Sequence, residues 1–120
     1  MRYAIVGSRD YNDLDYVLLY VSRIPLRDSN GDLNIIVSGG AKGVDSAAEA
    51  AGRKQGLGIL VFKPNWDEYG RAAGPIRNKK IIDNCDRLIA FWDGKSPGTK
   101  NSIELAEKAG KPVEVYVNTE

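Results

Sequence analysis

The sequence has no histidine, and this absence removes several kinds of chemistry. Without an imidazole there is no Ser-His or Cys-His catalytic pair, and the common nitrogen ligand of zinc and iron sites is missing. We therefore expect no metal and no bound cofactor. The single cysteine, Cys85, excludes an internal disulfide. It lies among Ile81, Ile82 and Leu88, a pattern that predicts a packed thiol rather than a nucleophile.

Long apolar runs and an excess of charge are also missing. No segment approaches the roughly 20 apolar residues of a membrane span, and the first strand begins too early to leave room for a signal peptide. These features predict a cytoplasmic protein without membrane association. The formal net charge of +1 weighs against general nucleic acid binding. Any anion site must then be local.

Five short apolar segments alternate with helical patterns over the whole chain. Strands are predicted at residues 2–6, 33–37, 57–62, 87–92 and 113–117, and helices at residues 13–23, 44–55, 76–85 and 100–109. Alternation of this kind is typical of a parallel sheet covered by helices on both faces. We predict a single α/β domain over residues 1–120, a Rossmann-like doubly wound sheet of about five strands in the order 3-2-1-4-5.

Residues 63–74 interrupt this pattern. The stretch holds Pro64, Trp66, Tyr69, Gly70 and Gly74 without periodicity and predicts a long irregular loop. Loops of that length in a compact domain are usually functional. The proline that follows, at position 75, fits the first position of a helix.

A glycine-rich turn between the second strand and its helix is the strongest single motif. It spans residues 38–45, SGGAKGVD, and includes Ser38, Gly39, Gly40, Lys42 and Gly43. Such a turn lets backbone N–H groups face a phosphate at a helix N-terminus, and the lysine adds a full positive charge. The alternative is a tight turn whose glycines serve only steric purposes.

The predicted topology brings three loops to one edge of the sheet. Residues 7–11, 39–45 and 93–99 follow strands whose carboxyl ends meet where the winding reverses, the usual ligand position in such sheets. All three loops are rich in glycine, hydroxyl and basic side chains. The sequence therefore predicts an anion or nucleotide site that includes Gly7 and Asp93.

Individual side chains in these loops have two interpretations each. Arg9 can hold a phosphate with its planar guanidinium or pair with Asp10 or Asp13. Ser8 can donate to a phosphate or cap a helix. Asp45 can accept from a ribose hydroxyl or cap the helix that it opens, and one residue can do both.

Further candidates come from the second half of the chain. Arg77 and Asn78, in the turn after the proline, are predicted to face the same edge. A second anion-binding turn is predicted ahead of the last helix, formed by Ser96, Gly98 and Thr99. Trp66 is the preferred surface for stacking a base, with Tyr69 and Trp92 as further candidates, the latter equally suited to the core. Asp45 and Glu104 are the carboxylate candidates for catalysis.

Four motifs together resemble the SLOG superfamily in its small stand-alone branch, found in bacteria and their phages. They are GSR at residues 7–9, SGGAKGVD at 38–45, GPIRN at 74–78 and FWDGKSPGT at 91–99. The resemblance implies a Rossmann-like fold and a nucleotide or nucleotide-derived ligand. Related proteins include LOG-type phosphoribohydrolases, which release a base from a nucleoside monophosphate, and the DNA-processing protein A family.

The resemblance also implies residue roles. It assigns phosphate binding to the two glycine turns and places Arg77 at the reaction centre of the LOG-type enzymes. Those enzymes use a glutamate where this chain has Asn101, an amide that cannot act as a general base. Two hypotheses follow: a sensor or sequestering module for a nucleotide-derived ligand, or an N-glycosidic hydrolase using Arg77 with Asp45 or Glu104. A homodimer through the last two helices is compatible with both.

Overall fold

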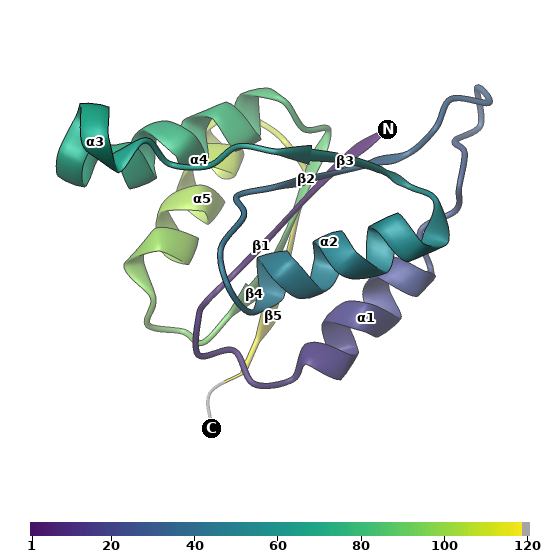
Figure 1. Ribbon diagram of the computed structural model, residues 1–120, viewed down its shortest axis with the longest axis horizontal. Coiled ribbons are helices and arrows are strands. Elements are labelled where there is room, and N and C mark those ends of the chain that lie inside the picture. The colour runs from purple at the N-terminus through teal and green to yellow at the C-terminus, as the bar shows by residue number, and fades with distance from the viewer. Residues whose placement is uncertain (119–120) are drawn as a thin grey trace.

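The computed structural model describes residues 1–118, which form a five-stranded parallel sheet in the order β3-β2-β1-β4-β5 (Figure 1). Its strands are β1 (Arg2–Gly7), β2 (Ile35–Ser38), β3 (Gly58–Val61), β4 (Arg87–Trp92) and β5 (Val113–Val117). Its helices are α1 (Leu14–Ser22), α2 (Val44–Gln55), α3 (Trp66–Tyr69), α4 (Ala73–Asp83) and α5 (Pro97–Lys108). The predicted Rossmann-like fold and strand order are confirmed. Within residues 1–118, no helix has the length and apolar character needed to cross a membrane.

Strand β1 is the centre of the sheet because it pairs with a strand on each side. Ala4 lies opposite Val37 of β2 and opposite Leu88 of β4. Ala4 and Ile5 are fully buried and point to opposite faces, as successive residues of a strand do. The apolar run that predicts this strand therefore reflects burial on both faces.

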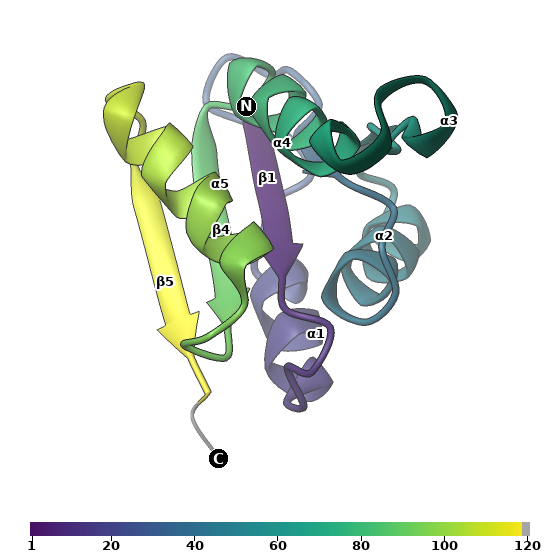
Figure 2. The ribbon, with the colours of Figure 1, turned by 90° about the vertical axis from the view of Figure 1, so that its left-hand side faces the viewer.

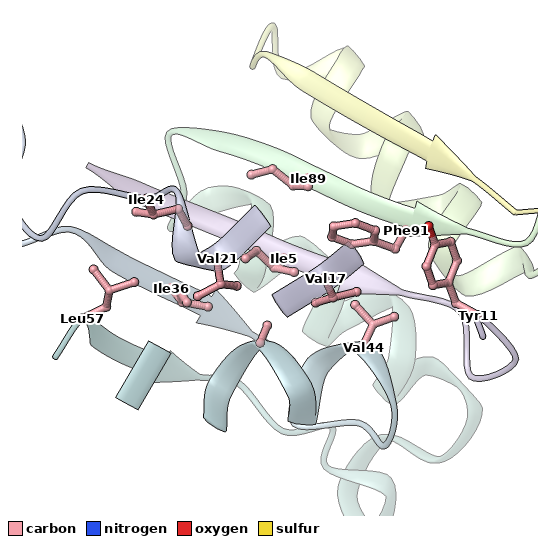
Figure 3. Packing of buried hydrophobic residues seen from close by; sticks show 11 residues of the cluster. Ile5, Tyr11, Val17, Val21, Ile24, Ile36, Val44, Leu57, Ile89 and Phe91 are labelled. Atoms are coloured by element: carbon pink, nitrogen blue, oxygen red, sulfur yellow. The ribbon is translucent and has the colours of Figure 1, made fainter. Parts of the chain in front are cut away.

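Each face of the sheet is covered by two helices, α1 and α2 on one side and α4 and α5 on the other (Figure 2). The core beneath α1 and α2 contains Ile5, Val17, Val44 and Phe91 (Figure 3). The core on the opposite face contains the buried Cys85, so the prediction of a packed thiol is confirmed. Each fully buried aliphatic or aromatic side chain of this size stabilises the fold by about 1.5–3 kcal/mol.

The ends of α1 and α2 follow the local signals in the sequence. The carboxylate of Asp13 accepts a hydrogen bond of 3.2 Å from the N–H of Tyr16, as an N-cap residue does. Helix α2 ends at Gly56, whose φ of 89° is the left-handed conformation that glycine adopts without strain. Both boundaries were predicted.

The segment 63–74 differs from the predicted irregular loop. It contains α3 and a 3₁₀ turn, η1 (Gly70–Ala72), that leads directly into α4. Asn65 starts α3 by accepting a 3.1 Å hydrogen bond from the N–H of Glu68, to whose carboxylate its amide also donates. This reciprocal cap is a sequence signal that the prediction overlooked.

Two further helix starts lie earlier than predicted. Helix α4 begins at Ala73, so Pro75 lies inside its first turn rather than at its first position. Proline is tolerated there because the first N–H groups of a helix have no intrahelical partner. Helix α5 begins at Pro97 instead of Lys100. Consequently Gly98 and Thr99 belong to the first turn of α5 and not to a turn preceding it.

A close contact between Gly7 and Val44 sets the distance between the end of β1 and the start of α2. A Cβ atom built on Gly7 would lie 2.4 Å from Cγ2 of Val44 and 2.5 Å from its Cβ. Since Val44 is fully buried, it has no space into which to move. The glycine is therefore needed for packing.

We expect Gly7→Ala to lower the free energy of unfolding by about 1–3 kcal/mol, the usual cost of an added methyl group in a full core. Gly98→Ala is the matched control, since a Cβ built there meets nothing within 4 Å. Urea denaturation followed by circular dichroism measures both. Equal stability of the two variants would contradict the packing role of Gly7.

Candidate functional site

A cavity with a volume of about 820 Å³ lies at the carboxyl ends of β1 and β4. Of the residues predicted for the site, it is lined by Gly7, Arg9, Asp45, Trp66, Arg77, Asn78, Asp93, Ser96, Gly98 and Thr99. An adjoining cavity of about 470 Å³ is lined by Gly39, Gly40 and Lys42, and shares Arg9, Trp66 and Arg77 with the first. The three loops expected to meet at this edge do so.

Asp45 organises the glycine turn from inside the protein. Its Oδ2 accepts hydrogen bonds of 3.2 Å from the N–H groups of Gly39 and Ala41. The N–H of Gly40 donates to the hydroxyl of Ser38 at 3.4 Å. These contacts correct the expectation that the N–H groups of this turn face a ligand, because an aspartate of the same chain already binds two of them.

Burial raises the pKa of the Asp45 carboxyl to about 6, although the N–H of Ala41 and the charge of Arg77 act in the opposite direction. The side chain is only 5% exposed, yet it contributes to the lining of the larger cavity. Both hydrogen bonds that this carboxylate accepts within residues 1–118 go to Oδ2 and not to Oδ1. The site thus contains a carboxyl group that titrates near neutral pH.

Arg77 reaches from α4 to the glycine turn. Its Nη1 donates to the carbonyl oxygen of Gly39 at 2.7 Å, and its Nε donates to Oδ1 of Asn78 at 2.9 Å. A Cβ on Gly39 would lie 2.4 Å from Nη1 of Arg77 and 3.0 Å from Oδ2 of Asp45. Gly39 therefore allows the guanidinium and the carboxylate to lie against the same turn.

Ser38 has a positioning role in the structure. The residue is fully buried, and its hydroxyl donates to Oε2 of Glu49 at 2.7 Å. Gly43 is the N-cap residue of α2, with a φ of 85° that favours glycine. Within the described residues, neither Ser38 nor Gly43 lines the two cavities. In the structure both residues hold the turn, and their contact with a ligand stays a prediction.

A second set of hydrogen bonds joins the β1 loop to the start of α5. The hydroxyls of Ser8 and Thr99, both buried, share a hydrogen bond of 3.3 Å. The hydroxyl of Ser8 also accepts from the N–H of Asp93 at 3.1 Å. Ser8 is therefore engaged inside the protein and, among the described residues, is not one that lines a cavity.

Asp93 shapes the loop in front of α5. Its Oδ1 accepts hydrogen bonds from the N–H groups of Lys95 at 2.8 Å and Ser96 at 2.7 Å. Both bonds lower the pKa of the Asp93 carboxyl, and the bond from Ser96 has the larger effect. The turn leaves the N–H groups of Gly98 and Thr99 at the N-terminus of α5, where a helix attracts an anion.

Asn78 and Asn101 line the larger cavity and are hydrogen-bonded to each other. The amide of Asn78, which is 7% exposed, donates to Oδ1 of Asn101 at 3.0 Å and to the carbonyl oxygen of Gly98 at 3.4 Å. Both residues line the cavity. Glu104, the second predicted catalytic carboxylate, is exposed on α5 and is not among the described residues that line either cavity.

The tryptophans occupy different surroundings. Trp66 is 56% exposed and borders both cavities, as its predicted stacking role requires. Trp92 is half-buried, and its indole N–H donates to the carbonyl oxygen of Ser96 at 3.1 Å. Trp92 thus supports the loop before α5, and Tyr69 is exposed on α3. Within the described residues, neither lines the two cavities.

Positive charge is concentrated locally despite the small net charge. The two cavities are lined by five basic residues and three acidic ones, namely Arg9, Lys42, Lys63, Arg77 and Lys95 against Asp10, Asp45 and Asp93. Two of the three carboxylates already bind N–H groups of the chain. The small net charge is therefore no argument against an anion, including a nucleic acid, at this edge of the sheet.

Lys63 and Lys95 were not predicted as site residues. Lys63 follows the last residues of β3, and Lys95 lies in the loop after β4. The available signal is their position just beyond the carboxyl ends of parallel strands. Among residues 1–118, no group of three histidine, cysteine, aspartate or glutamate side chains is arranged to hold a metal ion.

Comparison with known structures agrees with the fold. DNA processing protein A from Helicobacter pylori, reported for its single-stranded DNA binding mode, is similar with a TM-score of 0.75 and 22% identity. The match covers 96% of this chain and 64% of that one. DNA processing protein A from Streptococcus pneumoniae matches with a TM-score of 0.69 and 22% identity, over 95% of this chain and 49% of that one. This chain therefore spans 64% of the length of the first of these proteins and about half of the second.

A third structure, TM1055, matches with a TM-score of 0.69 and 22% identity over 94% of this chain and 72% of that one. Among sequences, Gene 61 protein of Mycobacterium phage D29 is 33% identical over 118 residues, which cover 93% of each chain. Residues 1–69 match YAcAr, the YspA, cpYpsA-related SLOG family. The four motifs and these matches agree: the chain belongs to the YspA, cpYpsA-related family of the SLOG superfamily.

Proposed function

We propose that this protein binds a nucleotide or nucleotide-derived ligand at the carboxyl edge of the sheet, as a sensor or sequestering module. The observation that carries the proposal is the joint lining of one edge by basic side chains, a helix N-terminus and an exposed indole ring. Arg9 and Lys95 line the larger cavity and form no ion pair within residues 1–118. Such side chains are free to bind phosphate.

The geometry suits a nucleoside phosphate in particular. A phosphate at the start of α5 would meet the N–H groups of Gly98 and Thr99, and Arg9 lines the same cavity. The ring of Trp66 offers a surface for a base. Each hydrogen bond to a charged group contributes about 1.5–3 kcal/mol, so a few of them support micromolar affinity after association costs.

Binding without cleavage is favoured by the identity of residue 101. The resemblance to LOG-type enzymes puts a catalytic glutamate at this position, where the present chain has an asparagine that accepts a hydrogen bond from Asn78. An amide in this place can orient a ligand but cannot take a proton from water. Three carboxylates line this cavity, those of Asp10, Asp45 and Asp93.

Hydrolysis of an N-glycosidic bond is the second candidate function, and Asp45 is the observation that favours it. A carboxyl with a pKa of about 6 is near the value that suits a general base at neutral pH. Asp45 would activate water while Arg77 and the α5 N-terminus hold the ribose phosphate. Both functions use the same cavity.

Isothermal titration calorimetry against nucleoside mono-, di- and triphosphates, NAD, ADP-ribose and cyclic nucleotides tests the first function. Arg9→Gln should weaken the tightest ligand about tenfold, because one charged contact to phosphate is lost. Arg23→Gln, at the C-terminal end of α1, is the matched control and should leave affinity unchanged. The absence of heat with every compound in the wild type would rule out the proposal.

Base release from nucleoside monophosphates, followed by chromatography, tests the second function. If the protein is a hydrolase, Asp45→Asn should slow release by about 10²–10⁴-fold, the usual contribution of a general base. Glu104→Gln should release base at the wild-type rate, because Glu104 is exposed outside the cavity. No release by the wild type would exclude hydrolysis of these compounds, and calorimetry would decide on binding independently.

The raised pKa of Asp45 has a consequence for stability. A carboxyl whose folded-state pKa exceeds its unfolded value stabilises the fold below that unfolded value, here 3.8, and the contribution is lost as pH rises through about 6. We expect the stability of the wild type relative to Asp45→Asn to fall by about 2.4 kcal/mol between pH 4 and pH 7. Urea denaturation across this range measures the difference, and a constant difference would contradict the raised pKa.

A further inference from the structure

The two cavities at the strand edge share part of their lining, and together they are called the groove. The shared residues are Arg9, Ala41, Trp66 and Arg77. The larger part ends at the N-terminus of α5, and the smaller part ends near the last residues of β3. Each volume, about 820 and about 470 Å³, is in the range of a small-molecule site.

The charged residues that line the smaller cavity are all basic. Lys42 and Lys63 line it together with Arg9 and Arg77, and among the described residues no carboxylate does. Neither lysine forms an ion pair within residues 1–118. The function proposed above uses the larger cavity, which leaves the charges of Lys42 and Lys63 without an assigned role.

Lys63 is placed by the glycine turn itself. Gly40 has a φ of 72°, and a Cβ built on it would lie 3.2 Å from Cγ and 3.4 Å from Cε of Lys63. The aliphatic chain of the lysine therefore runs along the turn at the position of the missing side chain. This contact brings the ammonium group to the turn that also carries Lys42.

Trp66 stands between the two cavities. It is the first residue of α3, and its indole remains 56% exposed. Figure 2 shows α3 beyond the end of α4, on the side toward α2, and not stacked on the sheet. An aromatic ring at such a boundary can stack a base while the phosphates on either side lie in separate cavities.

We infer that the groove binds a ligand with two phosphate groups separated by a nucleoside, as in a 5′-phosphorylated dinucleotide, and that Lys63 is a phosphate-binding residue. This inference rests on the proposed function. The first phosphate lies at the α5 N-terminus, the intervening base stacks on Trp66, and Lys42 and Lys63 bind the second phosphate. Such a ligand is either a free dinucleotide or a stretch of single-stranded DNA, which share this chemistry.

Calorimetry with three probes of one base tests the inference: dAMP, dADP and the dinucleotide pdApdA, with the thymine series in parallel. The wild type should bind the dinucleotide about tenfold more tightly than the other two, because only its phosphates reach both cavities. Lys63→Met keeps the aliphatic chain beside Gly40 and removes the charge. It should abolish the advantage of the dinucleotide and leave dAMP affinity unchanged.

Lys54→Met, an exposed position on α2 outside both cavities, is the matched control and should keep the advantage. Equal weakening of dAMP and pdApdA by Lys63→Met, or equal binding of dADP and pdApdA to the wild type, would overturn the second phosphate position alone. A wild type that binds none of the probes overturns the proposed function for these nucleotides as well. Longer oligomers separate the two sources: affinity that stops rising at the dinucleotide indicates a free ligand. Affinity that rises with length and falls steeply with salt indicates DNA.

Discussion

The buried carboxylate of Asp45 holds together the part of the molecule on which the groove depends. Asp45 lies at the start of α2 and accepts hydrogen bonds from two N–H groups of the glycine turn. The carbonyl oxygen of Gly39 in the same loop accepts a hydrogen bond from Arg77 of α4. Elements on opposite faces of the sheet are thereby connected through Gly39. Such a buried acceptor satisfies donors that would otherwise be unpaired, each of which would cost about 1–3 kcal/mol.

The hydroxyl of Ser8 connects loops by hydrogen bonds in the same way elsewhere at this edge of the sheet. It links the loop after β1 to Asp93 and Thr99, while Asp93 arranges the loop that leads into α5. These two sets of hydrogen bonds shape all three loops with groups from the protein alone. What remains available to a ligand is the set of basic side chains, the N-terminus of α5 and the ring of Trp66.

The strand order and the meeting of three loops could be predicted because apolar runs and glycine turns are local signals that parallel-sheet topology combines in few ways. The partners of the hydrogen bonds in these loops could not be predicted from the sequence. Glycine at position 39 predicts a turn equally well whether its N–H faces a phosphate or, as observed, Asp45. Glu104 shows the same limit, because the side of α5 that faces the cavity depends on how the helix packs. Lys63 does so too, because the path of its aliphatic chain over Gly40 depends on contacts between residues distant in the sequence.

Because Asp45 supplies an internal anion to the glycine turn, the shape of this turn is set by groups of the protein itself. The conformational entropy of ordering this loop is lost during folding and not during association. If the proposed ligand binds here, this side of the groove is preorganised for it. Selectivity for the spacing of its phosphates would then come from the fixed geometry of the turn.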